Sequence, residues 1–170
     1  MILNRAVSHS PILIASGCLL VLFLLSLFFF FVPRRPWIRR VLFFPKPGAA
    51  GLYGETRLLP ERRGLEESLQ LLVDELILGP VSPKLSKLMP REVRADSVIA
   101  RKGVVYLNLS RELVLGERRD SVSFDAIIEA AGNTVLFNFP QVRRLYIFVD
   151  GQVPGARYFA GVRFNPRLIR

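Results

Sequence analysis

Residues 64–80 read GLEESLQLLVDELILGP, and this stretch predicts an amphipathic helix over 64–78. Its acidic side chains lie mostly on one face, and its apolar side chains recur at helical spacing on the other. The helix ends at Gly79-Pro80, because glycine tolerates the left-handed conformation of a helix end and proline cannot continue the helix. A helix with one apolar face needs another layer to cover that face, so we expect strands around it. The predicted buried face consists of Leu65, Leu69, Leu72, Leu76 and Ile77.

The chain after this helix predicts a hairpin, a second helix and further strands. Residues 93–101 and 104–109 are two strands joined by the tight turn Lys102-Gly103. Ser121 or Ser123 can cap the second helix by accepting a bond from a free backbone N–H. The buried stripe of that helix would hold Phe124, Ile127, Ile128, Ala131 and Val135. Residues 142–149 predict a strand that ends in the turn Asp150-Gly151, and residues 158–164 predict a last short strand.

Two more strands are expected before the first helix, over residues 41–44 and 53–59. The resulting order is strand, strand, helix, strand, strand, helix, strand, strand. This order predicts an α+β fold, in which two helices pack on one face of a small, mainly antiparallel sheet.

The segment 11–32 (PILIASGCLLVLFLLSLFFFFV) holds no charge over 22 residues and is long enough to cross a bilayer core of about 30 Å. We therefore expect residues 1–10 to form a tail, 11–32 a transmembrane anchor, 33–40 a basic linker and 41–170 one globular domain. No small-residue cleavage site follows the apolar run, which favours an uncleaved anchor. Lipidation of Cys18, the sole cysteine, is the less favoured alternative.

The formal net charge is +10, and four arginines lie next to the apolar run. We expect Arg34, Arg35, Arg39 and Arg40 to contact lipid headgroups at the membrane surface. The positive-inside rule would place the domain in the cytoplasm, although large domains can be translocated largely regardless of charge.

The sequence offers little for catalysis. His9, the sole histidine, precedes the apolar run, and the globular part has no cysteine. Acidic residues are scattered, and there is neither a P-loop nor a glycine-rich dinucleotide motif. We therefore expect a protein without catalytic residues, metal or cofactor. Asp150 and Ser110 are interpreted as turn residues.

The remaining basic residues leave one alternative open, a surface that binds nucleic acid or another polyanion. Acidic residues are interspersed among these arginines, and the sequence shows no aromatic stacking pattern beside them, so nucleic acid is disfavoured. The arginines in question are Arg91, Arg94, Arg101, Arg118, Arg119, Arg143, Arg144 and Arg157.

Several phrases resemble the GerMN domain of sporulation and spore germination proteins. The helix LVDELILGP (72–80) resembles the family's helix ending in Gly-Pro, and GVVYLNLS (103–110) is similar to its strand ending in Leu-Ser. Asn133-Thr134 and LYIFVDG (145–151) resemble its closing helix and strand, and the similarity extends over 41–169 as a single copy. One departure is Gly132, where the family pattern favours a larger apolar residue. The resemblance implies structural roles for Gly79, Pro80, Gly103, Ser110, Asn133, Thr134, Asp150 and Gly151.

The resemblance implies a non-catalytic interaction module outside the cytoplasmic membrane, in an envelope, sporulation or germination assembly. We therefore expect a single-pass protein of the cytoplasmic membrane, with its C-terminal domain extracytoplasmic, that contacts membrane lipid and an envelope protein. Its oligomeric state is left open. The alternative is a basic domain that faces the cytoplasm and binds anionic lipid or nucleic acid.

Overall fold

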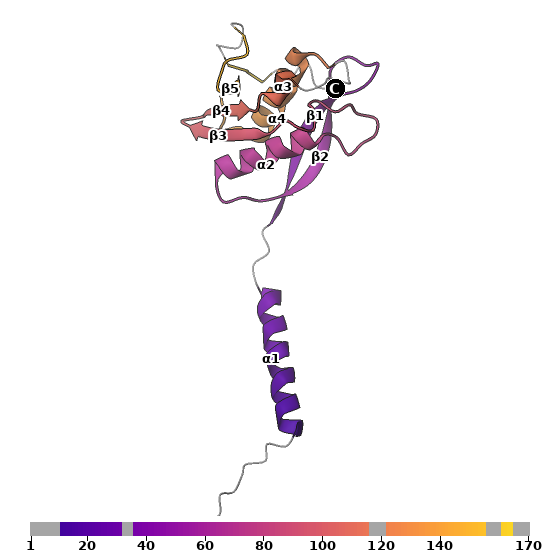
Figure 1. Cartoon of the computed structure of the whole chain (residues 1–170), viewed down its shortest axis with the longest axis vertical. Coiled ribbons are helices and arrows are strands. Elements are labelled where there is room, and N and C mark those ends of the chain that lie inside the picture. Colours follow the sequence, from indigo (N-terminus) through magenta and orange to yellow (C-terminus); the bar gives the residue numbers. More distant parts are fainter. Residues whose placement is uncertain (1–10, 32–35, 116–121, 156–160, 165–170) are drawn as a thin grey trace, which may run out of the picture. The chain divides into compact units, whose positions relative to one another are not determined.

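The computed structural model describes residues 11–31, 36–115, 122–155 and 161–164 (Figure 1). The chain divides into two compact units, Met1–Arg35 and Pro36–Arg170. The described part of the first unit is the helix α1, Pro11–Phe31. It carries no charged residue, and its described side chains are exposed. By length and composition its segment Leu13–Phe31 could cross a membrane, as the sequence predicts.

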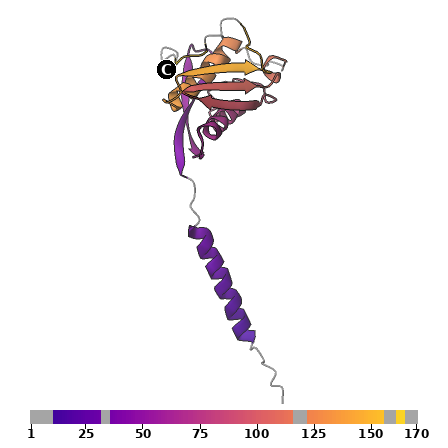
Figure 2. The same ribbon diagram turned by 90° about the vertical axis from the view of Figure 1, so that its left-hand side faces the viewer.

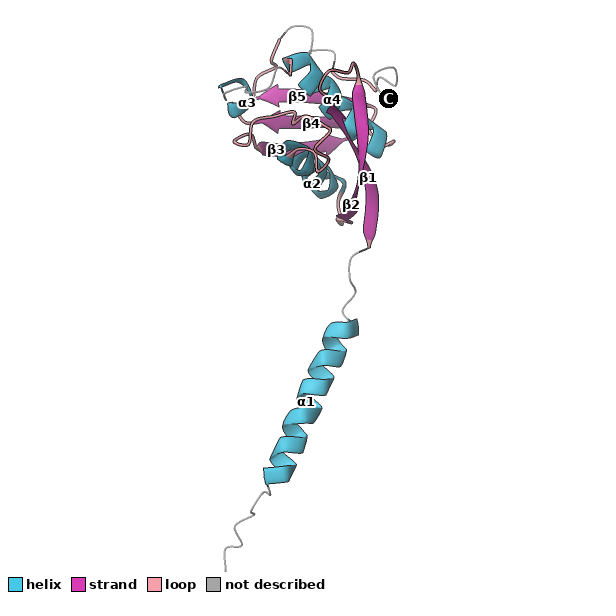
Figure 3. Ribbon diagram, turned by 90° about the vertical axis from the view of Figure 1, so that its right-hand side faces the viewer, coloured by secondary structure: helices cyan, strands magenta, loops and turns pink. Residues whose placement is uncertain are grey.

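The second unit has an α+β fold built from two small sheets. The strands β1 and β2 form an antiparallel hairpin, and the other sheet has the order β3-β4-β5. The helices α2 and α4 both lie on one face of the three-stranded sheet (Figure 2). The hairpin runs across the strands of that sheet and contacts α4 through β1 (Figure 3). The elements are β1 (Trp37–Pro45), β2 (Leu52–Pro60), α2 (Leu65–Leu78), β3 (Ala95–Arg101), β4 (Val104–Leu109), α3 (Glu112–Leu115), α4 (Phe124–Asn138) and β5 (Arg144–Val149).

The strand pairing refines the predicted single antiparallel sheet. β3 and β4 are antiparallel, but β4 and β5 are parallel, because the chain returns through α4 before it enters β5. β1 begins at Trp37, so residues 37–40, which the sequence assigned to the linker, lie in the hairpin. The consecutive Arg39 and Arg40 interrupt the apolar residues and hide this part of the strand from a hydropathy pattern. Of the predicted last strand, residues 158–160 lie outside the described residues, and Val162 forms one bridge with Leu145.

Side chains of α4 take the place of a third strand beside β1. The Thr134 Oγ1 accepts a hydrogen bond from the Phe43 N–H at 3.0 Å. One turn later, the Asn138 Oδ1 accepts from the Val41 N–H at 2.9 Å, and the Asn138 Nδ2 donates to the Val41 carbonyl at 2.6 Å. Thr134 is fully buried, so its bond satisfies a backbone N–H that water cannot reach, and the part-buried Asn138 pairs with both backbone groups of Val41. The hairpin is thereby fixed to the helix that covers the other sheet.

Arg40 strengthens the same junction. Its guanidinium donates to the Asn138 carbonyl at 2.7 Å and lies 4.4 Å from the centre of the Phe139 ring. Burial lowers the pKa of Arg40, and the nearby Glu61 carboxylate opposes this shift. Arg40 therefore has partners within the domain, whereas the sequence predicted that it contacts lipid headgroups.

An ion-pair network holds the end of α2 against β2. Arg57 donates to Glu55 at 2.6 Å and to Glu75 at 2.8 Å, and it also donates to the Gly79 carbonyl at 2.5 Å. The Glu55 carboxylate accepts bonds from the backbone N–H groups of Val81 and Ser82. The loop after the Gly-Pro end of α2 is thus fixed by charge-assisted bonds rather than by regular structure.

Gly132 is the departure from the family pattern that the fold explains. It lies in α4, where Val162 crosses the helix closely. A Cβ added at this position would lie 2.3 Å from the Val162 Cγ1. Glycine is therefore required here because of a close approach, although an apolar side chain would suit a buried helix position elsewhere.

Replacing Thr134 by valine tests the junction between α4 and the hairpin. T134V keeps the side-chain volume and removes the acceptor of the buried Phe43 N–H, so the free energy of unfolding should fall by about 1–3 kcal/mol. The matched control T56V alters an exposed threonine of β2 and should change it by less than about 0.5 kcal/mol. Denaturant unfolding of the full chain in detergent, followed by the fluorescence of Trp37, measures both. Equal effects of the two variants would contradict the docking role.

Glu55 predicts a pH dependence of stability. Burial alone would raise the pKa of Glu55, but bonds from the Ser82 and Val81 N–H groups and from Arg57 outweigh burial and lower it. The stabilisation is then fully present above the unfolded pKa of about 4.3, and it is lost as the pH falls through the lower native pKa. The difference in unfolding free energy between the native chain and E55Q should therefore shrink between about pH 6 and pH 3. A difference that stays constant over this range would show that Glu55 is not the titrating group.

Candidate functional site

The strand pairing places nine side chains on the face of the β3-β4-β5 sheet that lies opposite the helices. Buried residues alternate along β4 and β5 with residues that are at least partly exposed, so every second side chain points away from α2 and α4. The register aligns these outward positions in three rows across the sheet. We call this surface the outer face. Its rows are Arg101–Val104–Arg144, Ile99–Tyr106–Tyr146 and Ser97–Asn108–Phe148.

Aromatic rings occupy the middle of the outer face. Tyr106 and Tyr146 stack with their ring centres 5.5 Å apart and their planes 11° from parallel. The Phe148 ring lies 6.4 Å from Tyr106. Ile99 and Tyr106 are 45% and 39% exposed, which is unusual for large apolar side chains in adjacent strands. Among the described residues, these four form a contiguous patch that no helix covers (Figure 2).

Charges flank this aromatic patch. Arg101 and Arg144 lie in the row at one end, and the Arg144 Nη1 donates to the Tyr146 hydroxyl at 3.2 Å. At the opposite end Asn108 accepts a bond from the Gly151 N–H at 2.8 Å, next to Asp150. An aromatic platform flanked by guanidinium groups can bind planar or apolar groups and anions.

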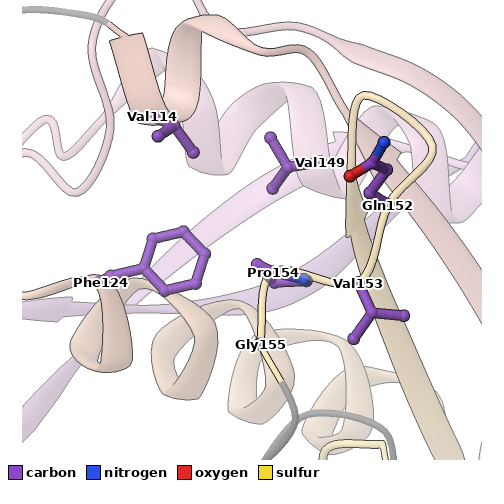
Figure 4. Close-up of a pocket in the computed structure, with 7 residues that line it drawn as sticks. All are labelled: Val114, Phe124, Val149, Gln152, Val153, Pro154 and Gly155. Atoms are coloured by element: carbon purple, nitrogen blue, oxygen red, sulfur yellow. The ribbon is translucent and has the colours of Figure 1, made fainter.

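A pocket of about 470 Å³ lies elsewhere, between α3, the start of α4 and the end of β5 (Figure 4). Gln152 supplies its polar side chain, and the rest of the lining is apolar or glycine. Since its described lining holds no charged group, this pocket can hold an apolar group but provides little specificity. Its lining residues are Val114, Phe124, Val149, Gln152, Val153, Pro154 and Gly155.

The structure does not bring the predicted family-motif positions together at one site. Gly79, Gly103 and Gly151 have φ angles of 95°, 78° and 75°, and Asp150 has 52°, so these residues form turns and a helix end. Pro80 follows the end of α2. Thr134 docks the hairpin, Asn133 beside it is buried, and the Ser110 Oγ accepts from the Arg94 N–H at 3.1 Å.

Of the predicted lipid contacts, Arg34 and Arg35 lie outside the described residues, and Arg39 is exposed on β1. Lipid binding by these arginines stays a prediction. Among the described residues no group of three or more His, Cys, Asp or Glu side chains could hold a metal ion.

The sequence analysis missed the aromatic patch. Tyr106 comes from one strand and Tyr146 from another, forty residues later, and only their parallel pairing stacks them. One pattern in the sequence could have indicated it. Tyr146 and Phe148 alternate with aliphatic residues along β5, and such alternation indicates that one face of the strand is at least partly exposed.

Replacing Tyr106 by alanine should leave the fold intact. The ring lies outside the core, so the free energy of unfolding should fall by less than about 1 kcal/mol. Its neighbour Leu107 is 1% exposed on the opposite face, and L107A should cost about 2–5 kcal/mol. Denaturant unfolding of the two variants compares them directly. A loss for Y106A as large as that for L107A would place Tyr106 in the core and contradict its assignment to a binding surface.

Comparisons with known proteins agree with the fold. The first GerMN domain of the sporulation protein GerM from Bacillus subtilis is similar in structure, with a TM-score of 0.52 and 16% identity over 75% of this chain and 94% of that one. The tandem GerMN domains of the same protein give a TM-score of 0.53 and 15% identity over 76% of this chain and 45% of that one. These identities show a common fold alone. A sequence comparison with curated proteins finds no match.

The family assignment rests on the sequence profile of Germane, which is described as sporulation and spore germination. It matches residues 41–154, two thirds of the chain, and covers the second half of β1 and every later strand and helix of the second unit. The resemblance that the motifs predicted is confirmed, and this chain belongs to the Germane family of sporulation and spore germination domains.

Proposed function

We propose that this chain is a membrane-anchored, non-catalytic binding module that docks a protein of the cell envelope through the outer face of its β3-β4-β5 sheet. The observation that carries this proposal is the aromatic patch, in which Ile99 and Tyr106 are exposed and Tyr146 and Phe148 are partly exposed. Exposed tyrosine and phenylalanine clusters are typical of protein-binding surfaces, because the rings bury a large area with little loss of side-chain freedom.

Two features support an anchored module rather than an enzyme. The helix α1 has the length and the apolar composition of a membrane crossing. The outer face combines aromatic rings with arginines, and among the described residues the Glu55 and Glu75 carboxylates pair with Arg57, which links β2 to the end of α2. The charged groups with the most partners therefore hold the fold together.

The family supports an extracytoplasmic position for the domain, as part of an envelope, sporulation or germination assembly. Protease digestion of intact spheroplasts tests this position. The domain should be degraded while a cytoplasmic control protein is spared. Protection until lysis would place the domain in the cytoplasm. The alternative function would then be favoured, in which the arginines of the outer face bind anionic lipid or nucleic acid.

Site-specific photo-crosslinking tests the docking surface in the native membrane. A photo-reactive phenylalanine analogue at Tyr106 should give discrete protein adducts, because this side chain lies at the centre of the outer face. The same analogue at Glu67, on the exposed side of α2, is the matched control and should give none. Equal labelling from both positions, or no adduct from Tyr106, would reject the outer face as the docking surface.

A further inference from the structure

The two ends of the outer face carry opposite charge. The turn between β3 and β4 and the start of β5 lie at one end, because Arg101 and Arg144 both align with Val104. Lys102 and Arg143 adjoin them in the chain and are exposed, so this end gathers four basic side chains. No carboxylate lies among the nine residues of the outer face. The four positive charges of this basic end produce a strong local electrostatic potential beside the apolar patch.

Acidic residues lie at the opposite end. Asp96 is the extra residue of the irregularity near the start of β3, and Asp150 follows the end of β5; both are exposed. Arg94 and Arg111 also lie near this end, where Arg111 pairs with Glu112 at 3.6 Å, so the described carboxylates of this end outnumber its arginines by one. Asp96 and Asp150 therefore define the acidic end of the outer face.

A surface with this charge pattern is complementary to itself. If a second copy is turned by a two-fold rotation, its acidic end faces the basic end of the first copy, and the reverse contact forms at the other side. The two aromatic patches then meet in the middle and exclude water from Tyr106, Tyr146 and Phe148. In a parallel arrangement the basic ends of the two copies would meet. Four basic side chains of one copy would then face the same four of the other, and their repulsion is unfavourable. The charges therefore select one closed, two-fold arrangement.

We propose that the occupant of the outer face is a second copy of this chain, in a two-fold dimer held by the aromatic patches and oriented by the opposite charges at their ends. This inference rests on the proposed function, since it names the partner of the same surface. Anchoring in one membrane supports such pairing, because it raises the effective concentration of the two copies.

Two charge variants of the full chain in detergent test the dimer. The acidic variant carries R101E, R143E and R144E, so both ends of its outer face have a net negative charge. The basic variant carries D96K and D150N, so both ends are basic or neutral; asparagine is used at position 150 because it tolerates the φ of 52°. Each variant alone should self-associate about tenfold more weakly than the native chain, because like ends meet. An equimolar mixture of the two should recover association, because opposite ends meet at both contacts.

Sedimentation gives the oligomeric state, and capture between copies with two different tags gives the composition of the mixture. The control variant R63E/K84E/R91E makes the same change in net charge as the acidic variant at exposed positions outside the outer face. It should dimerise like the native chain. Recovery in the mixture also shows that both variants are folded.

Three results would overturn the dimer. A native chain that stays monomeric, together with Tyr106 adducts to a different protein in the membrane, rejects self-association and leaves the proposed function standing. A dimer that both charge variants form as well as the native chain does would place the contact on α1 or another surface. Crosslinking of Tyr106 to nucleic acid would reject the dimer and the proposed envelope partner together.

Discussion

The fold depends on the contact between the side chains of α4 and the backbone of β1. Thr134 and Asn138 lie one turn apart on the helix and pair with the backbone of Phe43 and Val41, which has no strand on that side. A buried backbone N–H without an acceptor costs about 1–3 kcal/mol, so the hairpin can dock in one register only. This contact makes one unit of two small sheets that would be marginal alone.

The same arrangement leaves one surface of the domain without cover. Because α2 packs on β3, α4 packs on β5 and the two helices contact each other, both lie on the same face of the three-stranded sheet. The opposite face is left with Ile99, Tyr106, Tyr146 and Phe148, and such a patch is normally found where another molecule binds. The proposed binding surface thus follows from how the layers are stacked, while the turn glycines and the Arg57 network maintain that stacking.

Much of the local structure could be read from the sequence. The Gly-Pro end of α2, the Ser123 cap of α4 and the full extent of β4 are as predicted, since each depends on residues close together in the chain. The start of β1 was missed, because Arg39 and Arg40 interrupt its apolar pattern. The parallel pairing of β4 with β5 was also missed, since strand direction depends on the path that the chain takes through α4.

The sequence by itself determined the apolar helix, the α+β class and the family, because hydropathy, periodicity and motif order are properties of the chain alone. Only the tertiary structure decided which surface can bind. The stacked rings of Tyr106 and Tyr146, and the row that joins Arg101 to Arg144, come from different strands. They meet because backbone hydrogen bonds fix the register between those strands, and no local pattern encodes that register.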